Sequence, residues 1–332
     1  MTSNIKPCKT IVGGIDKIED AAFLIKSGRV VAFPTETVYG LGANAFDSQA
    51  VASIYEIKGR PQDNPFIVHI ADVDDLDRVA RCVPSAAIDL FESFSPGPLT
   101  IVLKKRHELP DVVTAGLDTV GIRIPAHIMA RQLIKLAGVP IAAPSANISG
   151  RISPTSAMHV FEYFNGKIPL ILDGGESQVG IESTVLDLTK SVPIILRPGS
   201  ITLGDLKEVL GDVFDNSSIE QNKPESPGAK YRHYAPQCPA VCAKSIQSII
   251  EIYDSNIDKC PVIIGAEHIK DKLGERAFLS LGQTSNDHAR TLFSMLRRAE
   301  QHYQYIIVQY FDDDNATGIY AGLNNRIIKA TR

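Results

Sequence analysis

Between residues 15 and 210, short apolar runs alternate with longer amphipathic stretches, and this alternation constrains the fold more than any other feature of the sequence. The apolar runs have the length of strands and the amphipathic stretches have helical spacing, so the pattern predicts a layered α/β domain. Several connections are too short to hold a crossover helix, which predicts a mixed sheet rather than a purely parallel one. The expected strands are 29–33, 66–70, 99–103, 120–124, 140–143, 170–172, 184–188 and 194–196.

A second, smaller domain is expected, because a chain of 332 residues exceeds what one hydrophobic core usually serves. Periodicity is lost between 211 and 239, where polar residues and prolines are typical of a linker. The strand–helix rhythm then returns, with strands expected at 240–243, 262–264 and 306–309 and helices at 245–253 and 285–302. We therefore predict a mixed, twisted sheet with helices at 15–210, a linker at 211–239 and a smaller α/β domain at 240–332.

The charge balance excludes proteins that hold nucleic acid through an overall basic field. Lys and Arg number 34 and Asp and Glu 38, which gives a formal net charge of −4, so any anion must be bound by a local group of cations. The opening of the chain has no apolar stretch suited to a signal peptide or a membrane span, and an odd number of cysteines, 5, argues against a disulfide framework. A cytoplasmic protein without membrane contact is expected.

Hydroxyl groups, a carboxylate and glycines follow the first expected strand. Thr35, Glu36 and Thr37 precede Gly40 and Gly42. Ligands of α/β sheets bind beyond the carboxyl ends of strands, and glycines allow a close backbone approach, so this segment is expected to be a ligand-binding loop. A turn with hydroxyl caps explains the same residues equally well.

Two cations lie on either side of an expected helix end. The helix at 48–58 stops at Gly59, which places Lys58 before the stop and Arg60 after it. Lys58 alone is explained by its interaction with the helix dipole. Together with Arg60, which Pro61 helps to hold, it predicts a solvent-facing anion clamp, since phosphoryl chemistry repeatedly uses an ammonium with a guanidinium.

Two expected strands each contain one polar residue inside an apolar run, His69 and Arg123. A single histidine in a strand is usually structural. An arginine in a buried strand needs an anionic partner, which is either a ligand anion or a carboxylate of the protein. The sequence leaves both partners open.

The strand at 140–143 also runs into polar groups. Ser145 and Asn147 alternate along the chain after it, and Ser153 precedes a helix that is expected to begin near Pro154. These side chains suit one polar ligand, and a helix N-terminus favours an anion. Together with the loop after the first strand, they predict one ligand site around the strand ends.

The second half of the linker places cations beside aromatic rings, in the run Lys230, Tyr231, Arg232, His233 and Tyr234. This composition suits a segment that closes over an anionic or planar ligand, and a solvated tether is the alternative. Cys238 and Cys242, near His233, lack the second ligand pair of a zinc site. No motif for a covalent nucleophile is present, so the loops favour positioning and charge neutralisation.

Taken together, these segments resemble the YrdC family in its long, two-domain form. The resemblance is carried by Lys58-Gly59-Arg60 with Ser145-Ala146-Asn147, by the stretch 34–41 and by the linker segment 226–236, and it extends over nearly the whole chain. It implies a YrdC-like sheet domain followed by a Rossmann-like domain.

The resemblance also implies an enzyme that joins L-threonine, bicarbonate and ATP into L-threonylcarbamoyl-AMP and releases pyrophosphate, with Mg²⁺ carried on ATP as the cofactor. Other proteins would transfer the threonylcarbamoyl group to tRNA next to the anticodon, so little direct binding of nucleic acid is implied. An RNA-binding module with a YrdC-like fold is the alternative, and tRNA affinity that persists at physiological salt without ATP would favour it. A carbamoyl transferase of the hydrogenase-maturation kind is disfavoured, because paired-cysteine zinc motifs are absent.

Carried over residue by residue, the resemblance implies two groups of site residues around the catalytic Lys58 and Arg60. The implied ATP-binding set is Arg60, Asn64, Thr119, Ser145, Asn147, Ser153, Arg197 and Tyr234, with Tyr231 as a second linker tyrosine. The implied threonine-binding set is Thr37, His69, Arg123, Ala143 and Ser183, with Arg123 opposite the threonine carboxylate. The resemblance leaves the metal ligands unspecified.

Overall fold

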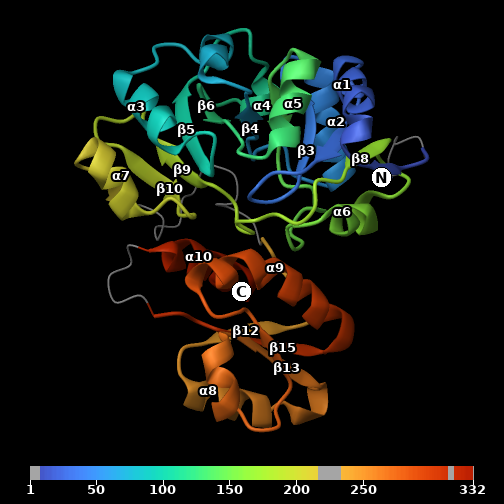
Figure 1. The fold of residues 1–332 in the computed structure, drawn as a ribbon, viewed down its shortest axis with the longest axis vertical. Helices are drawn as coiled ribbons and strands as arrows, with labels where there is room; N and C mark the ends of the chain where they lie inside the picture. Colours follow the sequence, from blue (N-terminus) through green and yellow to red (C-terminus); the bar gives the residue numbers. More distant parts are fainter. Residues whose placement is uncertain (1–7, 216–232, 313–317, 332) are drawn as a thin grey trace.

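The structure, a computed structural model, describes residues 8–215, 233–312 and 318–331. Two sheets organise them, one of 11 strands and one of 4 strands. In Figure 1 the large sheet and its helices form the upper half of the molecule, and the small sheet and its helices form the lower half. The α/β class predicted for both parts is confirmed. Most of the expected linker, including Lys230, Tyr231 and Arg232, lies outside the described residues.

The large sheet is mixed, as the short connections predicted. Its strands are β1 (Ile11–Gly13), β2 (Val31–Phe33), β3 (Gly40–Asn44), β4 (Ile67–His69), β5 (Leu99–Lys104), β6 (Thr119–Arg123), β7 (Ile141–Ala143), β8 (Leu170–Leu172), β9 (Thr184–Asp187), β10 (Ile194–Arg197) and β11 (Phe214–Asp215). They lie in the order β1-β8-β2-β3-β7-β4-β6-β5-β9-β10-β11. The pairs β4–β6 and β5–β9 are parallel, whereas β4–β7 and β5–β6 are antiparallel. This order places β7, β4 and β6 side by side, with the carboxyl ends of β4 and β6 at the same edge and the carboxyl end of β7 beside the start of β4.

One predicted loop is a strand. Gly40 and Gly42 lie in β3, where the sequence indicated a glycine loop. A Cβ atom at Gly42 would come within 2.6 Å of the Ile141 side chain and 2.7 Å of the Phe33 ring. At Gly42 the missing side chain therefore makes room for packing within the sheet, and the ligand-facing segment after β2 is shorter than expected.

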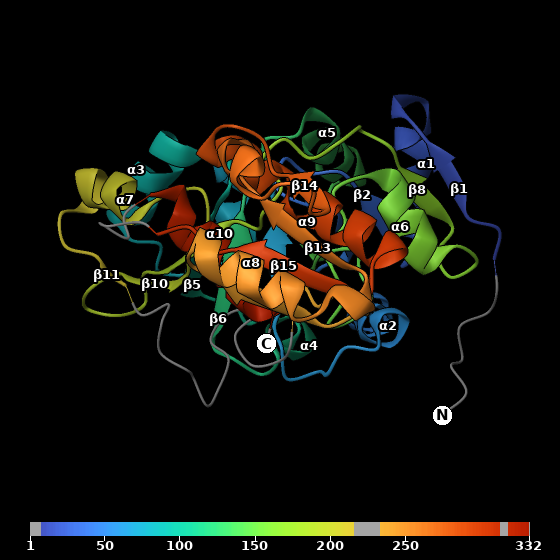
Figure 2. The same ribbon diagram turned by 90° about the horizontal axis from the view of Figure 1, so that it is seen from below.

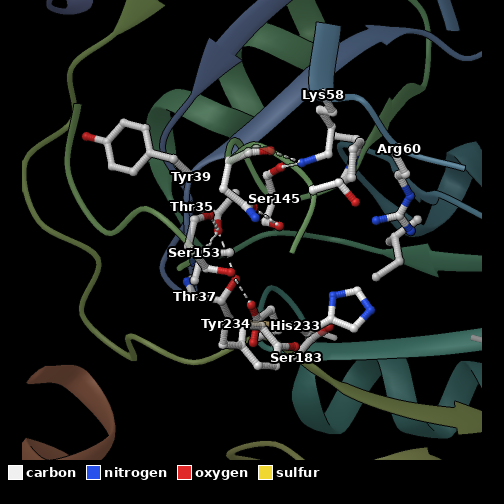
Figure 3. Close-up of a pocket in the computed structure, with 18 of the residues that line it drawn as sticks. Thr35, Thr37, Tyr39, Lys58, Arg60, Ser145, Ser153, Ser183, His233 and Tyr234 are labelled. Atoms are coloured by element: carbon white, nitrogen blue, oxygen red, sulfur yellow. Dashed lines mark hydrogen bonds between the residues drawn. The ribbon is translucent and has the colours of Figure 1, made fainter. Parts of the chain in front are cut away.

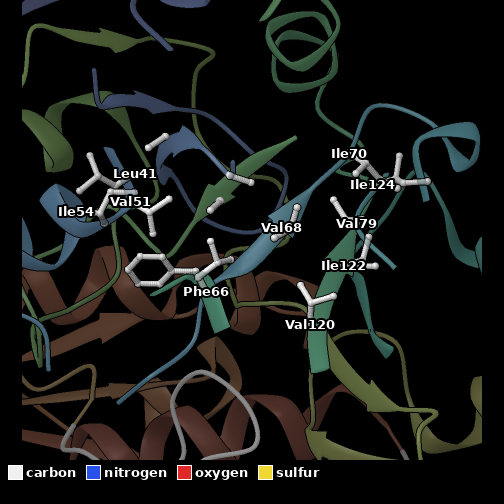
Figure 4. Packing of buried hydrophobic residues seen from close by; sticks show 14 of the residues in the cluster. Leu41, Val51, Ile54, Phe66, Val68, Ile70, Val79, Val120, Ile122 and Ile124 are labelled. Atoms are coloured by element: carbon white, nitrogen blue, oxygen red, sulfur yellow. The ribbon is translucent and has the colours of Figure 1, made fainter. Parts of the chain in front are cut away.

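Helices cover both faces of the large sheet, and alternate residues of each strand face opposite layers. Val31 and Phe33 of β2 pack with α1 and α5, whereas Ala32 belongs to the larger core on the other face. Figure 4 shows that larger core, with Val51 and Ile54 of α2 next to Phe66, and with Ile122 farther along the sheet beside Val79. The helices of this domain are α1 (Ile18–Lys26), α2 (Ser48–Lys58), α3 (Ser85–Phe94), α4 (Asp111–Thr114), α5 (Ile128–Ala137), α6 (Ala157–Phe164) and α7 (Leu203–Leu210), with 3-10 turns η1 (Ile15–Lys17) and η2 (Val73–Arg78).

The helix α2 begins and ends where the sequence predicted. Asp47 Oδ1 accepts hydrogen bonds from the backbone N–H groups of Gln49 and Ala50, both at 3.0 Å. At the other end, Gly59 adopts a left-handed conformation with φ of 61°. A capped helix packed on the core thus holds Lys58, its last residue, in a fixed position.

The small sheet is fully parallel in the order β12-β15-β13-β14. Its elements are β12 (Ala240–Ala243), α8 (Ile246–Asp254), η3 (Ile257–Lys259), β13 (Pro261–Gly265), η4 (Glu267–Lys272), β14 (Phe278–Ser280), α9 (Ser285–His302), β15 (Tyr305–Gln309) and α10 (Ile319–Ala330). Figure 1 shows α9 and α10 between this sheet and the large domain, with α8 on the far side. In Figure 2, seen from below, the small domain lies across the middle of the large one. Its inner helices therefore reach the large domain's strand-end loops.

Within the described part of the chain, no helix is both long and apolar enough to cross a membrane.

Candidate active site

A pocket lies where the strand ends of the large sheet meet Tyr234 of the linker (Figure 3). Of the site residues implied by the resemblance, it is lined by Thr37, Lys58, Arg60, His69, Arg123, Ala143, Ser145, Asn147, Ser153, Ser183, Arg197 and Tyr234. Asn64 and Thr119 are not among the lining residues. Asn64 is buried and accepts a hydrogen bond from Arg60 through its backbone oxygen, whereas Thr119 lines a small neighbouring pocket that shares Ile67 with this one. The ligand contacts of all these residues stay predictions.

Lys58 is buried, so the expectation that it faces solvent was wrong. Its exposed fraction is 1% because the loop after β7 folds over the end of α2. The ammonium donates hydrogen bonds to the carbonyl oxygens of Ser145, at 2.6 Å, and of Asn147. Burial, and then the nearby charge of Arg60, holds the pKa of Lys58 well below its usual value. An ammonium has three donors, so Lys58 both fixes this loop and keeps one donor for a ligand.

Arg60 is half-buried, beside Lys58 in Figure 3. Its Nε and Nη2 atoms donate to the carbonyl oxygens of Asn64, at 3.4 Å, and Pro65, at 3.3 Å. Its guanidinium also lies 5.4 Å from the centroid of the Phe66 ring. Burial lowers the pKa of Arg60 to about 10, so the group remains a cation at neutral pH. The arrangement leaves a charged, oriented guanidinium at the pocket wall.

The loop after β7 supplies oxygen ligands but no carboxylate. Ser145 Oγ donates to Asn147 Oδ1 at 2.5 Å, and the Asn147 amide donates to the carbonyl oxygens of Ile148 and Arg151. The helix predicted near Pro154 begins instead at Ala157, because the side chain of Ser156 caps it. Its N-terminus is therefore not a free anion site at Ser153.

The donor set of the pocket fits a magnesium ion that arrives on a nucleotide better than a resident one. Mg²⁺ prefers oxygen ligands and usually keeps several waters and substrate phosphates. In the described ranges, no group of three or more His, Cys, Asp or Glu side chains is placed to hold a metal ion. Ser145 Oγ and Asn147 Oδ1 are neutral oxygens of the kind that Mg²⁺ binds together with waters and phosphates.

Arg123 reaches the pocket from β6 and faces a carboxylate of the protein. Its Nη2 atom lies 2.7 Å from Oε1 of Glu36, and the two side chains are 4% and 8% exposed. Its Nε atom donates to the carbonyl of Gly97 at 3.2 Å, and Nη1 donates to Thr37 Oγ1 at 2.8 Å. Of the two partners that the sequence left open, the protein carboxylate is therefore present.

Apart from this ion pair, several buried polar atoms make no hydrogen bond. Within the described residues, the two Glu36 oxygens and Arg123 Nη2 contact each other only as charges, and Nδ1 of His69 has no hydrogen-bond partner. Buried polar atoms of this kind cost free energy unless they are paired, so a ligand with both donors and acceptors would be stabilised here. Burial and the charge of Arg123 lower the pKa of His69 to about 3, so its ring is neutral at physiological pH. We call Thr37, His69 and Arg123, which line the pocket, together with Glu36, which pairs with Arg123, the sheet end of the pocket.

Glu182 lines the pocket and was not assigned a role from the sequence. Its Oε1 atom accepts a hydrogen bond from Ser153 Oγ at 2.6 Å, and its Oε2 atom accepts one from Arg326 Nε of α10 at 3.0 Å. Nearby, the Nε and Nη2 atoms of Arg197 donate to the backbone and side-chain oxygens of Ser183, each at 3.1 Å. Glu182 lies just before β9, and nothing in its local sequence singled it out, because its partner Arg326 is distant along the chain.

Tyr234 is placed at the pocket by the C-terminal domain. It is 4% exposed, has a φ of 62° that is unusual outside glycine, and stacks on Phe293 of α9 with ring centroids 5.2 Å apart. Burial, and then the charge of Glu182, raises the pKa of Tyr234 to about 12. His233 also lines the pocket, where burial and Arg60 lower its pKa to about 3. We call Ser153, Glu182, Arg197 and Tyr234 the interdomain end of the pocket.

Residues 23–199 match the family model Sua5–YciO–YrdC, described as telomere recombination, and residues 201–331 match the model described as threonylcarbamoyl-AMP synthase, C-terminal domain. The chain belongs to the Sua5–YciO–YrdC family. Threonylcarbamoyl-AMP synthases that resemble this family member include those of Pyrococcus abyssi, 43% identical over 326 residues with 95% of this chain and 94% of that protein covered, and Bacillus subtilis, 44% identical over 330 residues with 95% and 92% covered. The crystal structure of Pyrococcus abyssi Sua5 complexed with L-threonine matches it with a TM-score of 0.89 at 42% identity, covering 97% of each chain. These findings confirm the family resemblance and the two-domain α/β fold.

Proposed function

We propose that this chain is a threonylcarbamoyl-AMP synthase, which makes L-threonylcarbamoyl-AMP from L-threonine, bicarbonate and ATP and releases pyrophosphate. The observation that carries the proposal is one pocket with phosphate-compatible cations, Lys58, Arg60 and Arg197, and a buried pair, Arg123 with Glu36, suited to a zwitterion. The similarity to synthases over 95% of the chain supports it.

The reaction needs no covalent enzyme intermediate. The amine of threonine and bicarbonate give a carbamate and water. A carbamate oxygen then forms a bond to the α-phosphorus of ATP, while the bond from that phosphorus to the bridging oxygen breaks and pyrophosphate leaves. The protein therefore has to hold two anions in line and offset their charge, which is the task of phosphoryl-transfer sites in general.

The cations of the pocket would bind the triphosphate. Arg60 offers a guanidinium on a rigid helix end, and Lys58 offers its remaining donor from a buried position where charge interactions are strong. Ser145 and Asn147 would complete the shell of Mg²⁺, which when bound neutralises phosphate charge. Asn64 and Thr119 would contact the more distant parts of ATP, since they lie beside the pocket wall.

Threonine would occupy the sheet end. A complex of the related Pyrococcus abyssi protein with L-threonine supports a threonine site in this family member. Arg123 Nη2 would pair with the carboxylate, Glu36 would accept from the ammonium, and Thr37 and Ser183 would contact the side-chain hydroxyl. His69 and Ala143 would close the remaining sides of the cavity. Small polar and apolar walls of this kind discriminate against larger amino acids.

The product would be passed to other proteins that transfer the threonylcarbamoyl group to tRNA in the cytoplasm, where the modification lies next to the anticodon. Little direct contact with RNA is proposed, because the net charge of −4 offers no overall basic surface.

The test is pyrophosphate release from ATP by the full chain, with threonine and bicarbonate each supplied or omitted, and mass spectrometry of the nucleotide product. We expect release only when both are present, together with a threonylcarbamoyl-AMP mass. Release that is indifferent to threonine would contradict the proposal. Serine and valine in place of threonine are the matched controls for the side-chain contacts.

A further inference from the structure

Arg326 is a fully buried charge in the C-terminal domain that reaches the large domain. It lies in α10 and is 0% exposed. Its Nε and Nη2 atoms donate to Oε2 and to the backbone oxygen of Glu182, both at 3.0 Å, and Nη1 donates to the carbonyl of Pro198. A buried guanidinium is stable only when its donors are paired in this way, so Arg326 ties α10 to two loops of the large domain.

One of these loops carries a residue that lines the pocket, and the other directly follows such a residue. Glu182 lines it directly and binds Ser153 through the carboxylate oxygen that Arg326 leaves free. Pro198 follows Arg197, whose guanidinium is fixed on the neighbouring loop. A shift of Arg326 would therefore be transmitted to three side chains at the interdomain end.

Close backbone packing makes this connection stiff. A Cβ atom at Gly322 of α10 would come within 2.8 Å of the Gly199 carbonyl oxygen. A Cβ atom at Gly180 would come within 2.4 Å of the Arg290 Cα atom of α9. Since backbone meets backbone at both points, flexible side chains do not take up a displacement of these helices.

We propose that Arg326 is a positioning residue for the ATP-binding side of the pocket, acting through Glu182 on Ser153 and through Pro198 on Arg197. This inference rests on the proposed synthase function and assigns the C-terminal domain a part in it. The charge balance agrees with the geometry. Burial alone would raise the pKa of Glu182, but the charges of Arg326 and Arg197 and the Ser153 hydrogen bond outweigh it and lower the pKa. Glu182 thus stays an acceptor that orients the Ser153 hydroxyl.

A second buried arginine of the same interface provides a matched control. Arg297 of α9 is 4% exposed, pairs with Glu162 at 3.2 Å and donates to the carbonyl of Ile152 at 2.9 Å. Neither Arg297 nor Glu162 lines the pocket. Replacing Arg297 weakens the contact between the C-terminal domain and the large domain, as replacing Arg326 does, but it removes no partner of Glu182.

The experiment compares Arg326→Gln with Arg297→Gln in the full chain, by thermal unfolding, by threonine-dependent pyrophosphate release and by calorimetric titration of threonine without ATP. We expect both variants to lower the melting temperature. Only Arg326→Gln should lower kcat/KM for ATP, by about tenfold or more, with the threonine Kd changed by less than about threefold. Arg326→Lys keeps the positive charge but loses the branched guanidinium that binds several oxygens at once. Its kcat/KM for ATP should lie between those of wild type and Arg326→Gln, and it serves as the test if Arg326→Gln does not fold.

A double-mutant cycle with Glu182→Gln separates positioning from general loosening. The part of the effect that runs through the Glu182 carboxylate is absent in the Glu182→Gln background, so replacing Arg326 there should lower kcat/KM for ATP by less than it does in the wild-type background. Wild-type kcat/KM in Arg326→Gln, or equal losses in Arg326→Gln and Arg297→Gln, would overturn this inference alone. A wild-type chain without threonine-dependent release would instead overturn the proposed function, and this inference with it.

Discussion

The two ends of the pocket are fixed by different parts of the molecule. At the sheet end, Arg123 is held by Glu36, Thr37 and Gly97, which all belong to the large domain. At the interdomain end, Glu182 depends on Arg326 of α10, and Tyr234 packs on Phe293 of α9. The sheet end is thus complete within one domain, whereas the interdomain end is complete only when the second domain is docked. Changes to the C-terminal domain should therefore affect ligands at the two ends unequally.

The largest effect is expected for the cations between the two ends. Lys58→Ala and Arg60→Ala should each lower kcat by about 100-fold or more, since each removes a preorganised charge. Their effects on stability should differ. Lys58→Ala leaves two buried carbonyl groups without a donor and should cost about 1–3 kcal/mol of unfolding free energy, whereas the half-buried Arg60 should cost less.

Pyrophosphate release and denaturant unfolding of both variants check this difference. Equal stability losses would show that the buried hydrogen bonds of Lys58 do not fix the loop after β7. Wild-type turnover in either variant would remove the anion clamp from the mechanism.

Removing the C-terminal domain should disrupt the interdomain end of the pocket and leave the sheet end intact. A fragment that ends at Asp215 keeps the sheet-end residues but lacks Tyr234, Phe293 and Arg326. We expect pyrophosphate release to fall by about tenfold or more and the threonine Kd, measured by calorimetry, to change by less than about threefold. Circular dichroism establishes that the fragment is folded. Full activity in a folded fragment would restore the tether interpretation of the linker.

A change at Arg123 should disrupt the sheet end of the pocket and leave the interdomain end intact. Arg123→Lys keeps a positive charge but loses the fork that meets Gly97 and Thr37, so the threonine Kd should rise about tenfold. The KM for ATP, measured at saturating threonine, should stay within about threefold. Lys104→Arg, at the end of the neighbouring strand β5, serves as a control that keeps the charge away from the pocket. A parallel rise of both constants in Arg123→Lys would mean that the two ends are not independent.

The smallest effect concerns His69 and pH. Its pKa is about 3 in the folded chain against an ordinary 6.5, so the unfolded chain binds the extra proton between these values. The stabilising contribution is therefore complete above pH 6.5 and is lost as pH falls toward 3. Between pH 7 and pH 4.5, wild type should lose about 2–3 kcal/mol more than His69→Gln. Denaturant unfolding at both pH values measures this, with the exposed His107→Gln as the control that should behave like wild type.

Much of the fold follows from local patterns. The polar stretch between β5 and β6 was too short for a crossover helix, which predicted a mixed sheet, and the structure pairs these two strands antiparallel. The strand β3 was not predicted, because glycines in a sequence usually indicate a turn. Here the Phe33 ring occupies the space that side chains at Gly40 and Gly42 would need, which the sequence does not show. The helix α10 was not predicted either. Its buried face carries Arg326 where an apolar residue would complete the helical pattern.

The sequence by itself determined the α/β class, the capped helix that ends at Lys58, and a set of polar residues after strands, because each depends on neighbours along the chain. Only the tertiary structure decided which partner each charge meets. The loop after β7 buries Lys58, Glu36 faces Arg123, and Arg326 reaches Glu182 from the other domain. Electrostatic and hydrogen-bond energies depend on distance and burial in space, and residues far apart in the sequence come into contact only through the packing of sheets and domains.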